Sequence, residues 1–451
     1  MAAVLGGLAL VVATPQPALA HGLGGRVDLP VPRWLFVWGA AAALVISFVA
    51  LGALWRQPRF EGRRDGVARD GPLQRLLTDA RVEWVVRFAG LAWFLLVAVA
   101  GLAGTDDPTR NLAPVAVYVW FWVGLAVACV FLGNLWATLS PFDTLARALQ
   151  VGEEPRRPYP AWLGAWPAAL LLLAFVWLEL VAPFGARPRI LGLAVAAYAA
   201  LTLSGMAVYG RDPWNRHGEA FAVLFDLLGR LAPLARDERG RVVLRPPLAG
   251  LASVRPRPGL LAFVCVLLGS TTFDGLSRSS AWLAATATLP PFPRAVAGTA
   301  GLLGAIAAVA GAYGLAMSAA AAIARRGWHP LAVRFAHSLV PIAFAYALAH
   351  YFSLLVLEGQ LGLALISDPF GRGWDLFGTA GRAVDLTLVS PVTIWYVQVA
   401  AIVAGHVGGV VLAHDRAVAV FPPALALRTQ YALLAVMVLF TVIGLVLLSG
   451  G

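Results

Sequence analysis

The stretch FAHSLVPIAFAYALAHYFSLLVLEG, residues 335–359, decides the fold because it is long and apolar enough to cross a lipid bilayer. It nevertheless contains His337 and His350 and ends beside Glu358. Ionisable groups inside membrane spans are costly without partners, so they are candidate functional residues. The two histidines are separated by ~20 Å along a helix axis, so we expect them to belong to different sites.

The whole chain has the composition of a membrane protein. Of its 451 residues, 60% are hydrophobic and 13% are charged, and the mean hydropathy is +0.78. Soluble domains carry about 25% charged residues. All 34 basic residues are arginines, and they gather between apolar runs. This pattern indicates anionic lipid head groups rather than nucleic acid, so we expect a multi-pass membrane protein embedded in the lipid bilayer.

Ten segments are long and apolar enough to span the membrane, which predicts an all-α integral membrane fold. The predicted spans are 34–55, 85–104, 114–136, 162–183, 190–209, 259–277, 296–324, 332–357, 391–413 and 428–449. With the N-terminus outside, the cytoplasmic loops contain 24 arginines and the outer segments nine. Positively charged loops stay in the cytoplasm, so both termini are predicted to lie outside.

Two regions stand apart from these spans. Residues 1–20 are typical of a signal peptide, whose cleavage would leave residues 21–451 as one polytopic domain beginning at His21. The segment 210–258 is the largest polar insertion on the cytoplasmic side. Its first half predicts an amphipathic helix on the inner membrane surface, and its second half predicts a strand pair turning at Glu238–Gly240.

The ionisable residues inside the spans fall into two layers when depth is counted along each helix at ~1.5 Å per residue. The inner layer contains His337, His406 and His414, and the outer layer contains Glu179, Asp274, His350 and Glu358. The run Gly269-Ser270-Thr271-Thr272 interrupts the sixth span just before Asp274. Broken backbone at membrane depth needs a cavity, so we expect one on the outer side, lined by Asp274 and Ser270.

Several functions remain open for these layers. His350 and Asp274, with His21 as a further ligand, suit a divalent metal that activates water, with Glu179, Asp274 and Glu358 as ligands or general bases of a hydrolase. His337 and His406 lie at matching depth and suit the two axial positions of a b-type haem. Gly405, beside His406, would admit a flat cofactor or another helix.

Two further alternatives need no cofactor. A ladder of polar groups across the membrane is typical of a proton- or metal-coupled transporter. The chain also suits an accessory role beside a partner membrane subunit.

Six stretches resemble a group of actinobacterial-type multi-pass membrane proteins that often carry the label fenitrothion hydrolase. They are HGLGGRVDLPVPRWLF, GNLWATLSPFDTL, VYGRDPWNRHGEAFAVLF, FDGLSR, AHSLVPIAFAYALAHYFSLLVLEGQ and YVQVAAIVAGHVGGVVLAHDRA, which extend from residue 21 to about residue 417. The resemblance implies a multi-pass protein of the bacterial plasma membrane and hydrolysis of an organophosphate triester with release of a phenol. It carries over no catalytic residues, and because such substrates are synthetic it implies a different native role.

Overall fold

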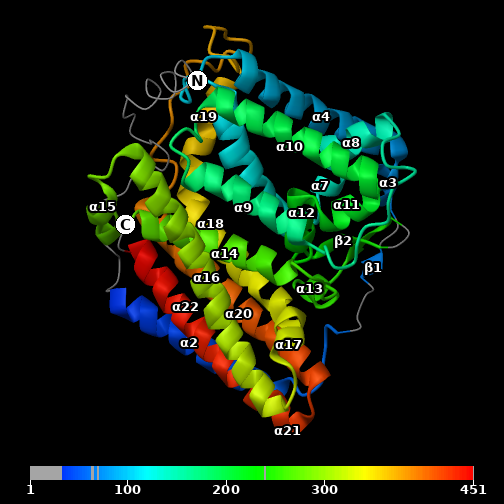
Figure 1. Ribbon diagram of the computed structural model, residues 1–451, viewed down its shortest axis with the longest axis vertical. Coiled ribbons are helices and arrows are strands. Elements are labelled where there is room, and N and C mark those ends of the chain that lie inside the picture. Colours follow the sequence, from blue (N-terminus) through cyan, green and yellow to red (C-terminus); the bar gives the residue numbers. More distant parts are fainter. Residues whose placement is uncertain (1–32, 62–65, 69–70, 238–239, 450–451) are drawn as a thin grey trace.

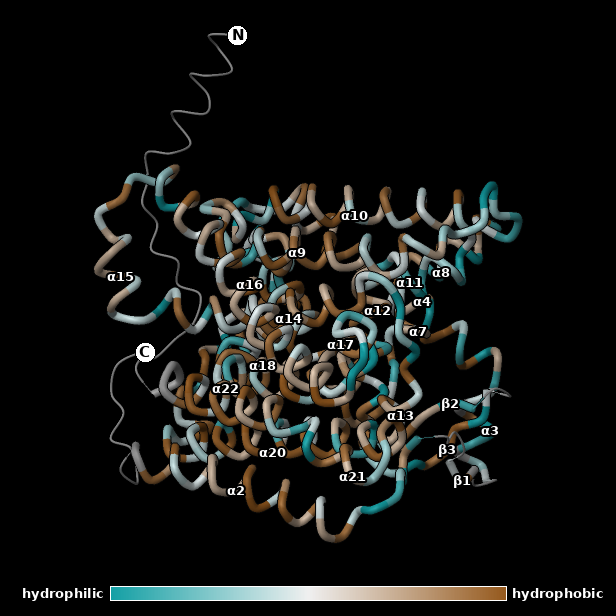
Figure 2. Tube along the Cα trace, turned by 60° about the horizontal axis from the view of Figure 1, so that its bottom comes forward, coloured by the Kyte–Doolittle hydropathy of each residue, from teal (hydrophilic) through white to brown (hydrophobic). Residues whose placement is uncertain are grey.

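The structure, a computed structural model, describes residues 33–61, 66–68, 71–237 and 240–449 (Figure 1). Within these residues, nine helices are long and apolar enough to cross a membrane. Figure 2 shows apolar positions along the long helices and hydrophilic ones around α3 and α8. The chain is therefore a polytopic helical membrane protein. The predicted signal peptide and His21 lie outside the described residues.

Six of the nine spans are single helices, and three are chains of shorter helices joined end to end. The single helices are α2 (Arg33–Leu54), α4 (Ala80–Ala103), α10 (Pro188–Tyr209), α14 (Leu260–Ser277), α16 (Pro291–Ala324) and α20 (Pro391–Val420). The composite spans are α5–η1–α6 (Leu112–Pro114, Val115–Leu125, Ala126–Leu132), α17–η2–α18–η3–α19 (Trp328–Phe335, Ala336–Leu339, Val340–Ser353, Leu354–Glu358, Gly359–Leu365) and α21–η4–α22 (Pro423–Ala426, Arg428–Gln430, Tyr431–Ser449). The remaining helices are α3 (Pro72–Thr78), α7 (Trp136–Leu139), α8 (Pro141–Ala148), α9 (Trp166–Leu180), α11 (Arg211–His217), α12 (Ala220–Gly229), α13 (Ala249–Ala252) and α15 (Ser280–Thr286).

The tenth predicted span, 162–183, corresponds to α9, which has 15 residues. At ~1.5 Å per residue it is ~22 Å long, less than the ~30 Å hydrocarbon core. Pro167 occupies its first turn and Pro183 follows its end, and both positions are typical of helix boundaries. The count of ten spans therefore stays a prediction.

Helices α14 and α18 lie in the middle of the bundle (Figure 1). α14 packs against α9 and α16, and α18 packs against α14 and α20. α4 and α10 pack against each other on one side, and α2, α20 and α22 form a second group on the other. A side chain on the inward face of α14 or α18 is therefore shielded from lipid.

The predicted interruption of the sixth span is wrong, because α14 continues through Gly269–Thr272. The Ser270 and Thr271 hydroxyls donate to the carbonyl of Leu267, so the helix itself satisfies them. Gly269 lets α16 approach, since a Cβ there would lie 2.6 Å from Ile306 Cα. The buried Ser270 hydroxyl therefore serves the helix and does not line an outer cavity.

The predicted surface helix of the 210–258 insertion is also wrong. Eight of the ten residues of α12 are buried, and the helix packs against α6, α7 and α9. Its buried N-cap residue, Glu219, accepts hydrogen bonds from Phe221 N (2.9 Å), Ala222 N, Trp136 Nε1 (3.0 Å) and the Tyr198 hydroxyl. A carboxylate at a helix N-terminus is stabilised by the unpaired N–H groups and the helix dipole. Glu219 therefore anchors a helix inside the protein.

The strand pair of the same insertion is confirmed as β2 (Leu234–Arg236) and β3 (Val242–Leu244), which are antiparallel with Ala235 opposite Val243. A third strand, β1 (Val67–Ala68), pairs with the other edge of β3. The sheet therefore ties the 56–84 loop to the 210–258 insertion.

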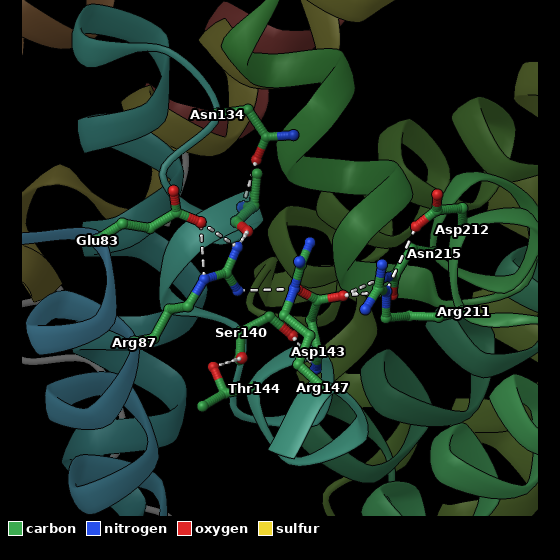
Figure 3. Close-up of polar contacts among 11 residues, drawn as sticks. Glu83, Arg87, Asn134, Ser140, Asp143, Thr144, Arg147, Arg211, Asp212 and Asn215 are labelled. Atoms are coloured by element: carbon green, nitrogen blue, oxygen red, sulfur yellow. Dashed lines mark hydrogen bonds and ion pairs between the residues drawn. The ribbon is translucent and has the colours of Figure 1, made fainter. Parts of the chain in front are cut away.

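A cluster of ion pairs around the buried carboxylate of Asp143 joins α4, α8 and α11. Asp143, at the start of α8, accepts from Arg87 Nη1 (2.8 Å) on α4 and from Arg147 Nε (2.8 Å). Its other oxygen accepts from Asn215 Nδ2 (3.0 Å) on α11 and lies 3.4 Å from Arg211 Nε (Figure 3). Each carboxylate oxygen has two donors, so this cluster holds three helices together.

A second cluster of polar contacts surrounds Asp415 near the end of α20. Its carboxylate accepts from Trp55 Nε1 (2.9 Å) and from the backbone amides of residues 59–61. His414 lies 3.0 Å from the Trp55 carbonyl, and Arg416 pairs with Glu61 and donates to the Ala252 carbonyl (2.8 Å). Three of the loops predicted to be cytoplasmic thus meet at one end of the bundle.

Candidate functional site

The outer-layer residues Asp274 and His350 come together in the structure. Asp274 is buried in the last turn of α14, and His350 lies near the end of α18, the neighbouring helix. His350 Nε2 lies 2.7 Å from Asp274 Oδ2, and the two side chains are 8% and 4% exposed. Depth counting predicted that they share a layer, and the structure adds a direct hydrogen bond.

Two residues that the sequence did not single out complete this pair. Arg278, the C-cap residue of α14 and one turn beyond Asp274, places Nη2 3.1 Å from Asp274 Oδ1. Tyr351, next to His350, is buried and hydrogen-bonds to Asp274. The four-residue spacing in FDGLSR was a usable signal for Arg278, because residues at i and i+4 face each other on a helix. Both oxygens of Asp274 therefore have protein partners.

Glu179 brings a second carboxylate to the site. It lies near the end of α9, which packs against α14, within electrostatic range of Asp274 and Arg278. Its Oε2 is buried and has no hydrogen-bond partner. Most buried side-chain oxygens do have a partner, so such an atom marks a site with unused binding capacity.

Two π-helical segments border this site. The π-helix η1 places Tyr118 within electrostatic range of Glu179, and the π-helix η3 directly follows the turn containing His350 and Tyr351. The two segments pack together, and Trp120 Nε1 donates to the Gly359 carbonyl (3.1 Å). π-Helical turns are frequent at functional sites because they displace side chains from the regular helical face.

Glu358, the last outer-layer residue, is half-buried at the end of η3, about two turns beyond His350. Within the described residues, no three His, Cys, Asp or Glu side chains gather as a metal-binding group. A metal bound by both His350 and Asp274 would replace their hydrogen bond and lie beside the Arg278 guanidinium. The metal prediction stays a prediction.

The inner histidines have separate surroundings. His406 Nδ1 donates to the Ile402 carbonyl (2.8 Å), and His337 is held by the carbonyl of Arg334. The Nε2 atom of each is buried without a hydrogen-bond partner. These contacts fix the neutral tautomer whose Nε2 has a lone pair, which is the form that binds a metal or accepts a proton.

The glycine face beside His406 is occupied by a helix. A Cβ on Gly405 would overlap Ala345 Cβ and lie 2.7 Å from the Pro341 carbonyl oxygen. α20 therefore lies directly on α18 along this face, and no gap remains there for a flat cofactor. The haem prediction remains to be tested by a Soret absorption band in the purified protein.

The fold and this buried polar cluster define a polytopic membrane protein with an ionisable site between its central helices. Comparisons with protein-family models, with curated proteins and with solved structures find no match to this chain.

Proposed function

We propose that this protein is a proton-coupled membrane transporter in which Asp274, His350 and Glu179 bind and release the proton. The observation that carries the proposal is the 2.7 Å hydrogen bond between two buried ionisable groups, His350 and Asp274. Ionisable residues that face the interior of a membrane bundle and pair with one another are typical of proton relays.

The charges of the cluster support proton binding. With His350 neutral, Asp274 and Glu179 carry two negative charges and Arg278 carries one positive charge, a sum of −1. Uptake of one proton therefore makes the cluster neutral, which removes the cost of a net charge in an apolar interior. The unpartnered Oε2 of Glu179 gives that proton a place to bind.

A pH jump on proteoliposomes adsorbed to a solid-supported membrane tests this proposal. The wild-type protein should give a transient current as the buried cluster takes up protons, without any transported substrate. Asp274→Asn should abolish the current, since it neutralises the cluster permanently. The control is Asp385→Asn, an exposed carboxylate between α19 and α20 whose loss should leave the current unchanged. Equal currents from the wild type and Asp274→Asn would contradict the proposal.

The hydrolase predicted from the family resemblance is the second candidate, favoured by the same pair. A carboxylate bonded to one imidazole nitrogen orients the other nitrogen as a general base for attack of water on an ester. Release of the phenol from an organophosphate triester, followed by absorbance with and without added divalent metal, tests it. His350→Gln should abolish the release, and the absence of any turnover by the wild type would eliminate this candidate.

A further inference from the structure

A large cleft opens at the arginine-rich end of the bundle, between α9, α14, α16, α17 and α20. Its volume is about 1210 Å³, which exceeds the ~300–1,000 Å³ typical of small-molecule pockets. Its walls are apolar and include Leu173, Leu261, Val266 and Ile306. These side chains suit a hydrocarbon chain.

The mouth of this cleft is cationic. Arg257, Arg326, Arg334 and Arg416 line it, and no acidic residue is among the described residues of its wall. Glu61, which pairs with Arg416, is outside this lining and neutralises one of the four charges. The mouth therefore has an excess of positive charge and is complementary to an anion.

Arg257 lines this mouth and has an unsatisfied hydrogen-bond donor for an anion. Its Nε is buried without a hydrogen-bond partner, and its Nη1 faces His217 Nδ1 at 3.4 Å. Burial lowers the pKa of Arg257, as expected for a guanidinium removed from water; the carboxylate that acts on it electrostatically, Asp226, is outside the cleft. An anion in the mouth would supply the missing acceptor.

The position of the cleft matches one leaflet of a bilayer. Trp166 lines the cleft, and Trp328 lies between the lining residues Gly327 and His329 in the chain. The two tryptophans are 46% and 51% exposed, which is typical of side chains at the lipid head-group level. Ile306, in the deep wall, packs against Gly269 of α14, which is nine residues or ~14 Å from the start of that helix at Leu260. This depth is about half of the ~30 Å hydrocarbon core, so an acyl chain fits between mouth and deep wall.

We propose that this cleft binds one anionic phospholipid of the surrounding leaflet, with its phosphate at Arg257 and Arg334 and an acyl chain along α14. The site is separate from the Asp274–His350 cluster. A bound lipid would fill the space between α9, α14 and α16 and so connect membrane composition to the helices that carry Glu179 and Asp274.

Native mass spectrometry of the delipidated protein in detergent tests this site. With added phosphatidylglycerol, we expect one retained lipid on the wild-type chain and none with phosphatidylcholine. The double variant Arg257→Gln/Arg334→Gln should weaken retention about thirty-fold, because each arginine near an anionic head group contributes roughly a factor of five to six. Arg255→Gln is the matched control, since Arg255 is exposed, two residues away and outside the cleft lining.

A second variant keeps the test independent of the arginines. Ala262→Phe would fill the apolar wall and should also prevent retention, while thermal unfolding confirms that the variants fold. Unchanged phosphatidylglycerol retention in both variants would overturn the proposal. Displacement of the lipid by millimolar inorganic phosphate would equally overturn it, because it would assign the cleft to a free anion.

Discussion

Replacing Gly405 by alanine tests whether α20 lies directly on α18. An added Cβ would overlap Ala345 Cβ and lie 2.7 Å from the Pro341 carbonyl oxygen. Carbon–oxygen contacts are normally about 3.3–3.6 Å, so the helices would have to separate by at least ~0.6 Å. Both obstacles belong to the backbone or to a Cβ, so no flexible side chain can move aside.

The expected change in the free energy of unfolding is the difference between two opposing effects. Alanine in place of glycine favours a helix interior by up to ~1 kcal/mol. Overpacking of a close contact costs roughly 1–3 kcal/mol, and here the obstruction is rigid, so the cost is at the upper end. We therefore expect Gly405→Ala to lower the free energy of unfolding by about 1–2 kcal/mol, a factor of roughly 5–30 in the folded-to-unfolded ratio.

Gly408 provides a matched control on the same helix. A Cβ there would lie 3.4 Å from Pro341 Cβ, an ordinary contact, so Gly408→Ala should be neutral or stabilising by up to ~1 kcal/mol. Unfolding by sodium dodecyl sulfate in mixed micelles, followed by tryptophan fluorescence, measures both variants. If the two alanines change stability equally, or if Gly405→Ala is the more stable, α18 and α20 do not touch along this face.

Three further predictions use the same unfolding assay. Asp143→Asn should cost about 1.5–3 kcal/mol, because Arg87 would lose its buried carboxylate and keep only the partly exposed Glu83, whereas Asp212→Asn, whose side chain is 72% exposed, should change stability by less than ~0.5 kcal/mol. Glu219→Gln should cost about 2–3 kcal/mol, since an amide NH₂ would face an N–H donor in the buried cap, and an unchanged midpoint would refute that assignment. Burial lowers the pKa of His217 from 6.5 to about 4, so the folded state binds fewer protons than the unfolded state between these values. Stability should therefore fall as the pH decreases from about 6.5 to about 4, and His217→Gln should flatten this dependence; an unaltered pH profile would contradict it.

The sequence predicts which segments span the membrane more reliably than it predicts which helices pack against one another. Length and hydropathy identify a span such as 391–413, because the bilayer imposes both. Counting residues along each span placed Asp274 and His350 at one depth, since the helical rise is fixed. Lateral packing has no such regularity, so the hydrogen bond between them had to come from the structure.

The two errors have local physical causes. The helical spacing of WNRHGEAFAVLFDLLGRLAPLA predicts an amphipathic helix, yet the helix that forms, AFAVLFDLLG, has one charged residue, Asp226, and is apolar on nearly every face. A helix that is hydrophobic all round belongs in an interior rather than on a surface. Likewise, the polar run Gly269–Thr272 predicts an interruption of the span, although inside a membrane protein the hydroxyls of Ser270 and Thr271 bond to a preceding carbonyl and leave the helix intact.

The completeness of hydrogen bonding separates the structural carboxylates from Glu179. Asp143, Asp415 and Glu219 each accept at least four hydrogen bonds or ion pairs, so each holds elements together and has little capacity for another ligand. Glu179 differs, because one of its buried oxygens has no donor although it lies near Asp274. An unsatisfied buried oxygen costs about 1–3 kcal/mol. A proton bound there would remove the charge of the carboxylate. Among these buried carboxylates, Glu179 is thus the one best placed to bind a proton.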